Sequence, residues 1–306
     1  MEPVDVLSVV VRAAAFIAAL QSAGLAWFTA ACGRSASAGA GAAAASLQSA
    51  LRASALCALA LVLIHRGLDA ARFAGEWSGI LDAHLQMLVW SRHPGFSSAL
   101  CAAGLIAVLV GSLELKSRPG RWAAYLGSAG AFAVAASFAL TGHTRQAAHA
   151  GLARALLSLH VGIVAYWIGA VAGLYRLTRQ SELTRQSDPT RRSDPREAAS
   201  AAEQFSRTAV WLVPLILPAG LALIWILLPD LAALRTVYGA FLLAKFLGFC
   251  VLIVLAAANR LRYVAALAQG TVSATRAFER VLIAEYVVMA SVLAATAAMT
   301  SLFSWH

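Results

Sequence analysis

Long apolar runs recur along the whole of this 306-residue chain and constrain its fold more than any other feature. A run of about 20 apolar residues forms a helix long enough to cross the roughly 30 Å hydrocarbon core of a bilayer. Hydrophobic residues make up 60% of the chain and charged residues only 12%, whereas soluble domains are about 25% charged. The sequence therefore predicts an all-α, polytopic membrane protein with one membrane domain over residues 1–306.

Eight membrane spans are predicted from these runs. They cover residues 5–31, 47–65, 96–114, 121–142, 154–177, 208–228, 237–258 and 280–303. Pro214 and Pro218 lie inside the sixth span. Because each proline removes a backbone donor, this helix should kink or open locally.

The basic residues predict the orientation of these spans. Most of the lysines and arginines fall in or near the loops after spans one, three, five and seven, which places those loops in the cytoplasm and both termini in the periplasm. The net charge of +10 is thus explained by topology rather than by nucleic-acid binding. Residues 178–207 contain repeated Thr-Arg-Gln-Ser units and predict a flexible cytoplasmic loop.

Residues 66–95 predict a periplasmic loop that contains an amphipathic helix in the membrane interface. The apolar positions recur at helical spacing between Trp77 and Val89. His84 and Met87 are three residues apart and share a helix face; imidazole plus thioether is a pair compatible with Cu(I). Asp82 is expected to orient a histidine or to cap the start of the helix.

All seven histidines fall at or near the predicted periplasmic face. They are His65, His84, His93, His143, His149, His160 and His306. Imidazole is a common ligand of copper, iron and zinc, so the sequence predicts a metal site formed from His143, His160, His84, Met87, His149 and His93. His160 lies inside an apolar run, where a polar group is costly and usually functional.

Two charged residues inside spans predict a polar route through the bundle. Lys245 lies in the seventh span and Glu285 in the eighth. A lysine at that depth needs a partner or a water-filled cavity, and a pair between Lys245 and Glu285 is one arrangement that the sequence allows.

Several motifs resemble the copper resistance protein D (CopD) family. In "LHVGIVAYWIGAVAGLY" the matching positions are His160, Trp167 and Gly169, and Gly142-His143 precedes them. The resemblance continues through "FSRTAVWLVPLILPAGLAL", with Phe205, Ser206, Arg207 and Gly220, and through "YGAFLLAKFLGFCVLIVLAAANRLR", with Tyr238, Gly239, Lys245, Asn259 and Arg260. It covers roughly residues 140–265.

The resemblance implies a bacterial inner-membrane protein that moves copper from periplasm to cytoplasm, beside a periplasmic carrier of the CopC type. It also implies His143 and His160 as metal ligands. This chain departs from the family pattern at two positions: the first span, "VRAAAFIAALQ", has no histidine, and Leu156 stands where a second histidine is common.

The leading hypothesis is therefore copper transport, with membrane lipid as the surrounding partner and no enzymatic activity. No nucleotide-binding Gly-rich motif is present, so transport would be passive or driven by a gradient. The alternative is a haem b cytochrome or metalloreductase, with axial ligands drawn from His143, His160, His65 and His84. A third hypothesis is a copper sensor or scaffold that binds the ion without moving it.

Overall fold

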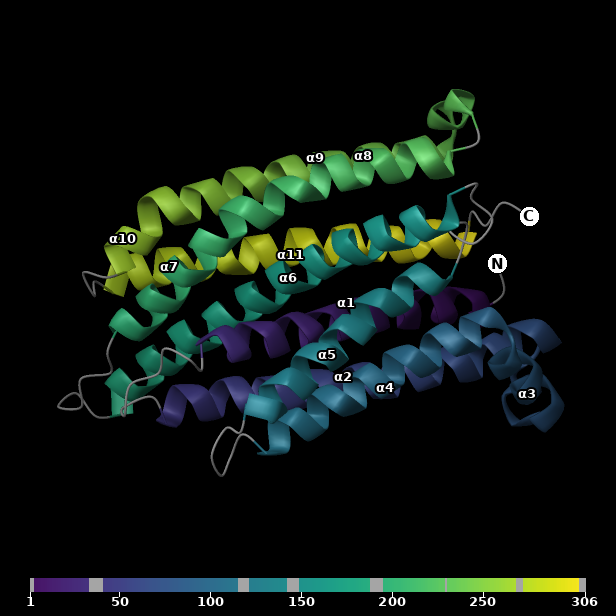
Figure 1. Cartoon of the computed structure of the whole chain (residues 1–306), viewed down its shortest axis with the longest axis horizontal. Helices are drawn as coiled ribbons and strands as arrows, with labels where there is room; N and C mark the ends of the chain where they lie inside the picture. Colours follow the sequence, from purple (N-terminus) through teal and green to yellow (C-terminus); the bar gives the residue numbers. More distant parts are fainter. Residues whose placement is uncertain are drawn as a thin grey trace.

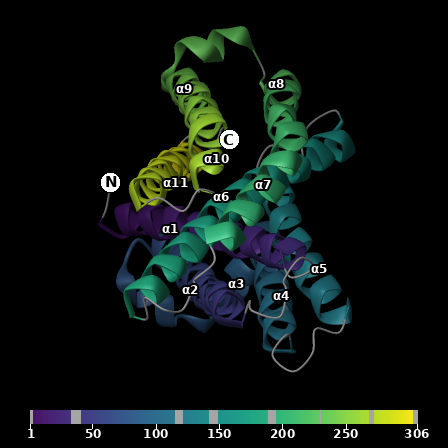
Figure 2. The same ribbon diagram turned by 90° about the vertical axis from the view of Figure 1, so that its left-hand side faces the viewer.

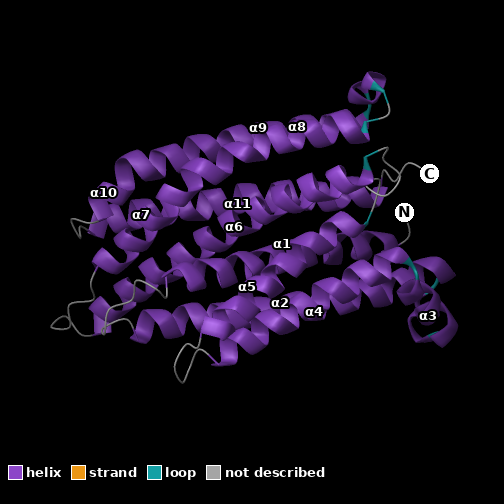
Figure 3. Ribbon diagram, viewed as in Figure 1, coloured by secondary structure: helices purple, strands orange, loops and turns teal. Residues whose placement is uncertain are grey.

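The protein is a bundle of long helices (Figures 1 and 3). A computed structural model describes residues 3–32, 41–114, 121–141, 149–187, 195–228, 230–267 and 272–302. The long helices are α1 (Pro3–Cys32), α2 (Gly41–Ala74), α4 (His93–Glu114), α5 (Arg121–Ser137), α6 (Ala150–Ser187), α7 (Pro195–Leu212), α8 (Ile216–Leu227), α9 (Val237–Ala258) and α11 (Val272–Leu302). Within the described residues no strand occurs, and eight helical stretches are long and apolar enough to span a membrane. The predicted fold class is confirmed.

Successive spans run in opposite directions, as eight membrane crossings require. The first residue of α1, Pro3, and the last residue of α11, Leu302, lie at the same end of the bundle (Figure 1). We call this the terminal end. α6 and α9 both start there and run in parallel toward the opposite end. Which end faces the periplasm remains the prediction drawn from the arginines.

α1 lies at the centre and packs against α2, α4, α5, α6 and α11 (Figure 2). Small residues bring α1 and α6 into backbone contact: a Cβ on Gly24 would overlap the carbonyl of Ala165, and one on Gly169 would overlap the backbone of Gly24. Membrane helices associate through such close packing because lipid chains are as apolar as the side chains themselves.

The hairpin of α8 and α9 is packed much less tightly. α8 packs on α6, whereas α9 packs on α11. η5 (Leu231–Arg235) joins the two at the terminal end, where they stand apart. At the opposite end their continuations, α7 and α10 (Val264–Leu267), pack together (Figure 2). Of the most apolar 18-residue window in the span Val237–Tyr263, only 6% is buried inside the protein, so most of α9 would face lipid.

Helices α2, α6 and α7 extend furthest beyond the limits predicted from the sequence. α2 continues to Ala74, so residues 66–74 of the predicted loop 66–95 are helical. Arg66 and Arg72 both pair with Asp69 within this extension. These ion pairs stabilise charged residues in the part of the helix that follows its apolar run. At the opposite end, α6 reaches Ser187 and α7 begins at Pro195, so the predicted loop 178–207 is largely helical where it is described.

The predicted interfacial helix is divided into two short ones. After Gly75, whose φ of 75° requires a glycine, η1 (Trp77–Leu81) precedes α3 (Ala83–Ser91). Asp82 separates them and caps α3, because its Oδ1 accepts hydrogen bonds from the backbone N–H groups of His84 and Leu85 at 2.8 and 3.1 Å. The capping role expected for Asp82 is confirmed.

The sixth span is interrupted at its first proline, as predicted. α7 ends at Leu212, a 3₁₀ turn, η4, covers Val213–Leu215, and α8 starts at Ile216. Pro214 lies inside this turn, whereas Pro218 lies in the first turn of α8, where a missing N–H costs little. The break determines which backbone groups of α8 face its neighbours.

Candidate functional site

His160 lies in the third turn of α6, half-buried, with its ring against the start of α8. Its Nδ1 lies 3.2 Å from the carbonyl oxygen of Ile216. Because a carbonyl can only accept, Nδ1–H is the donor, and Nε2 of the neutral ring is left with its lone pair. This is the arrangement of metal-binding histidines, in which a carbonyl fixes the tautomer and the other nitrogen holds the ion.

The His160 ring packs against the first two turns of α8. Gly220 lies beside His160, and a Cβ there would meet Cε1 of the imidazole at 3.6 Å. The Ile216 carbonyl lies four residues earlier, in the first turn after the proline-containing break. A carbonyl has two lone pairs, so it can accept from the imidazole as well as from its own helix. The start of α8 therefore supplies the acceptor that fixes His160.

Lys245 on α9 is the charged residue that acts on His160. It is half-buried, and its charge interacts electrostatically with the imidazole. Within the described part of the chain, Lys245 belongs to no ion pair with Glu285 or with any other carboxylate. The Lys245–Glu285 pair that the sequence allowed is therefore not formed.

Glu285 on α11 is only 2% exposed. Its Oε2 accepts a hydrogen bond from Trp167 Nε1 at 3.3 Å, and its Oε1 accepts one from Asn259 Nδ2 at 3.0 Å. Trp167 follows His160 by seven residues on α6, and Asn259, which directly follows α9, is fourteen residues after Lys245, so each pair shares a helix face. The four residues and Glu285 form a polar column, which we define as His160, Lys245, Trp167, Asn259 and Glu285.

Sequence reasoning did not find the partners of Glu285. Trp167 and Asn259 were recognised only as positions shared with a family, without a role. Their spacing could have indicated them, because Trp167 is seven residues from His160 and Asn259 fourteen from Lys245. Spacing within one helix does not show which helices face each other, however.

The remaining predicted metal ligands are dispersed. His84, Met87, His93 and His149 are all exposed; the first three lie on α3 and at the start of α4, whereas His149 immediately precedes α6. His143 lies outside the described residues, as does His306. Among the residues that are described, no group of three or more His, Cys, Asp and Glu side chains is arranged to hold a metal ion.

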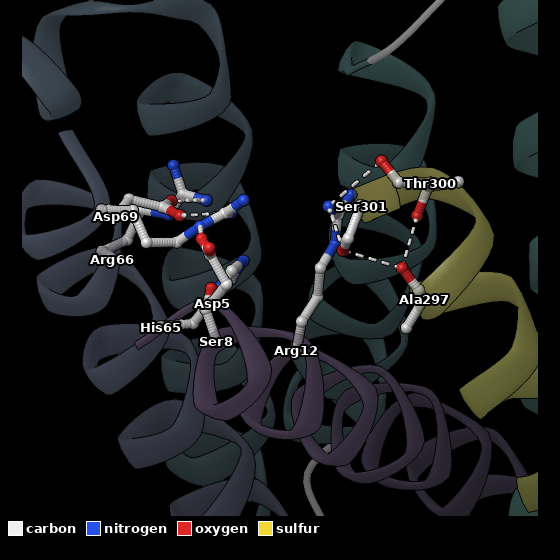
Figure 4. A network of polar contacts seen from close by, with 10 residues as sticks. Asp5, Ser8, Arg12, His65, Arg66, Asp69, Ala297, Thr300 and Ser301 are labelled. Atoms are coloured by element: carbon white, nitrogen blue, oxygen red, sulfur yellow. Dashed lines mark hydrogen bonds and ion pairs between the residues drawn. The ribbon is translucent and has the colours of Figure 1, made fainter. Parts of the chain in front are cut away.

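His65 belongs to a separate polar network at the terminal end (Figure 4). The His65 Nδ1 and the Ser8 Oγ are 3.4 Å apart, between α2 and α1. Nearby, Arg66 pairs with Asp69 at 2.5 Å and Arg72 with Asp5 at 2.9 Å. Figure 4 also shows Arg12, whose guanidinium donates to Ser301 Oγ at 3.0 Å and so ties α1 to α11. Ion pairing and helix packing account for these residues.

Comparison with known proteins supports the resemblance found in the sequence. Residues 199–299 match the family model described as copper resistance protein D, CopD. This segment contains η4, Lys245, Asn259 and Glu285, so three of the five residues of the polar column lie in it. No curated protein and no solved structure matches the chain.

Proposed function

We propose that this CopD-family protein transports copper across the bacterial inner membrane, from periplasm to cytoplasm, with His160 as the ligand that receives the ion. The family match over residues 199–299 supports a copper-handling membrane protein. One observation carries the finer proposal: the Ile216 carbonyl holds Nδ1–H of His160 and leaves Nε2 as a free nitrogen ligand inside the membrane span.

The other ligands are proposed to come from the terminal end. α6 starts there, and His160 lies ten residues into it. His143 and His149 precede α6 in the chain, and His84, Met87 and His93 lie on α3 and at the start of α4 at the same end. Imidazole binds both oxidation states of copper, and the thioether of Met87 would favour Cu(I). Copper would collect on these exposed groups before it reaches His160.

The rest of the polar column is proposed as the transport path. Lys245 lies close enough to His160 for its positive charge to oppose a bound cation. Glu285 offers two carboxylate oxygens deeper in the bundle. An ion held by His160 would thus encounter a repelling group and then an attracting one. This order of groups along the path allows the ion to leave His160 rather than remain trapped there.

The partners follow from the same proposal. The long, apolar and outwardly exposed helices require lipid around them. If the arginine-rich loops are cytoplasmic, the terminal end faces the periplasm, where a carrier of the CopC type would deliver copper. The basic loops need no nucleic-acid partner to explain them.

The direct test is copper uptake by proteoliposomes that contain wild-type protein or His160→Ala. We expect His160→Ala to abolish uptake while the amount of folded protein is unchanged, because the half-buried ring gives up a single hydrogen bond among the described residues, to the Ile216 carbonyl. His306→Ala is a control of the same residue type, which no step of the proposal uses. Unchanged uptake in His160→Ala would refute the assignment.

The alternative is haem binding, which a free Nε2 on a membrane histidine also permits. Its second axial ligand would come from His65, His84 or His143. A visible Soret band in the purified protein would identify a cytochrome or metalloreductase instead. Copper binding without flux in liposomes would identify a sensor or scaffold.

A further inference from the structure

Glu285 is a carboxyl group buried without a cation. It is 2% exposed, and both of its oxygens accept hydrogen bonds from neutral groups, the Trp167 indole and the Asn259 amide. Within the described residues, no lysine, arginine or histidine lies at ion-pair distance from it. An ionised carboxylate is expensive to keep in a low-dielectric interior with neutral partners only. The site therefore lacks one positive charge.

Asn259 supplies a second and independent sign that a ligand is missing. Its side chain is 8% exposed, and its Oδ1 is buried without a hydrogen-bond partner. It also begins a π-helical turn, Asn259–Tyr263, and such turns occur frequently at functional sites. A buried acceptor without a donor is costly, and this one belongs to the amide that already contacts Glu285. A proton on the carboxyl group would provide the donor.

We propose that the Glu285 carboxyl group binds and releases the proton whose movement is coupled to copper transport. The inference rests on the proposed function, to which it adds the coupling ion. In the ionised state, the Asn259 amide donates N–H to Oε1. When the carboxyl group takes up a proton from water, rotation of the amide presents Oδ1 to accept the new O–H. Trp167 N–H donates to the other oxygen in both states. Asn259 Oδ1, which has no hydrogen-bond partner in the ionised arrangement, gains one in the protonated state.

The other ionisable groups on the helices packed around Glu285 have different surroundings. On α6, His160 donates a hydrogen bond to the Ile216 carbonyl. On α9, the charge of Lys245 interacts electrostatically with His160. On α1, Arg12 donates to Ser301.

On α11, Tyr286 donates to Gln21 Oε1, and Glu279 lies six residues from Glu285, nearer the opposite end. Tyr263 is the last residue of the π turn that Asn259 begins. Glu285 alone among these is a carboxyl group held by two neutral donors.

Infrared titration of the purified full-length protein tests proton binding without any need for copper transport. Wild-type protein should show a carboxyl C=O band that appears as the pH is lowered and shifts on H/D exchange. Glu285→Gln should lack this band, whereas Glu203→Gln, at an exposed carboxylate, should keep it. Trp167→Phe removes one donor and should change the frequency of the band, which provides a second variant should Glu285→Gln fold poorly. A band unaltered in both variants, or no titrating band, overturns the proposal.

Coupling is tested by copper uptake in proteoliposomes with and without a pH gradient, with cupric chloride plus ascorbate outside. Wild-type uptake should change at least severalfold with the gradient, and uptake by Glu285→Gln should not respond. An equal response of both proteins overturns coupling through Glu285. No uptake by wild-type protein, together with the Glu285 infrared band, would instead refute copper transport and leave the proton site established.

Discussion

The two parts of the bundle differ in how tightly they are packed. α6, like α2, α4 and α5, has 39% of its most apolar window buried, and its backbone touches that of α1 through Gly24 and Gly169. The corresponding window of the span that contains α9 is 6% buried. The family match, residues 199–299, covers the last three spans, whose windows are 22%, 6% and 28% buried. α2, α4, α5 and α6 thus pack closely around α1, whereas α8 and α9, with the π turn after α9, bring Ile216, Lys245 and Asn259 to the polar residues of α6 and α11.

The largest effect is expected from Gly169→Ala. Its Cβ would overlap the backbone of Gly24, so α1 and α6 must separate, at a cost of about 3 kcal/mol or more. Most of the folded protein should be lost, as measured by monodisperse yield in size-exclusion chromatography. Gly162→Ala, on the same helix, is the matched control because its nearest atom, in Trp27, is 3.8 Å away. Equal yields would show that the scaffold is not close-packed.

An intermediate effect is expected from leucine truncation in the scaffold. Leu105 on α4 is fully buried, whereas Leu247 on α9 is 54% exposed. In lipid the transfer term largely cancels, and the cavity left by Leu105→Ala should cost about 1–2 kcal/mol. Leu247→Ala should change the free energy of unfolding by less than about 0.5 kcal/mol. Denaturation in mixed micelles measures both, and a larger cost at Leu247 would contradict the packing difference.

The smallest effect is expected from Asp5→Asn at the terminal end. The Asp5–Arg72 pair is about one-third exposed on both sides, and Arg72 keeps Asp69 as a second partner at 3.8 Å. Pairs of this kind contribute less than about 1 kcal/mol. The midpoint of thermal unfolding and the rate of copper uptake should both stay close to wild type. A marked fall in uptake would place this network on the copper path, contrary to the proposal.

The sequence was enough to predict the helical fold but not all helix ends. The eight spans could be predicted because apolar length decides whether a segment can cross the membrane. The break at Pro214 could be predicted because proline lacks a backbone N–H. The continuation of α2 past Arg66 depends on the partner of each charge, Asp69 for Arg66 and Asp5 for Arg72. Asp5 lies on another helix, and such a pairing is not visible in a local pattern.

The candidate site was predicted in part for a similar reason. His160, Lys245 and Glu285 were identified because polar residues in apolar runs are unusual. Their neighbours were not, since Ile216 contributes only a backbone carbonyl and any residue has one. The polar contacts of Glu285 depend on how α6, α9 and α11 are rotated against one another, which no single-helix pattern determines.

The proposed transport requires that Nε2 of His160 bind copper. Pulsed electron paramagnetic resonance of the purified protein, loaded with one equivalent of Cu(II), measures this most directly. The wild-type spectrum should show imidazole nitrogen couplings that are reduced by one histidine in His160→Ala and unchanged in His306→Ala. Identical spectra for wild type and His160→Ala would contradict it.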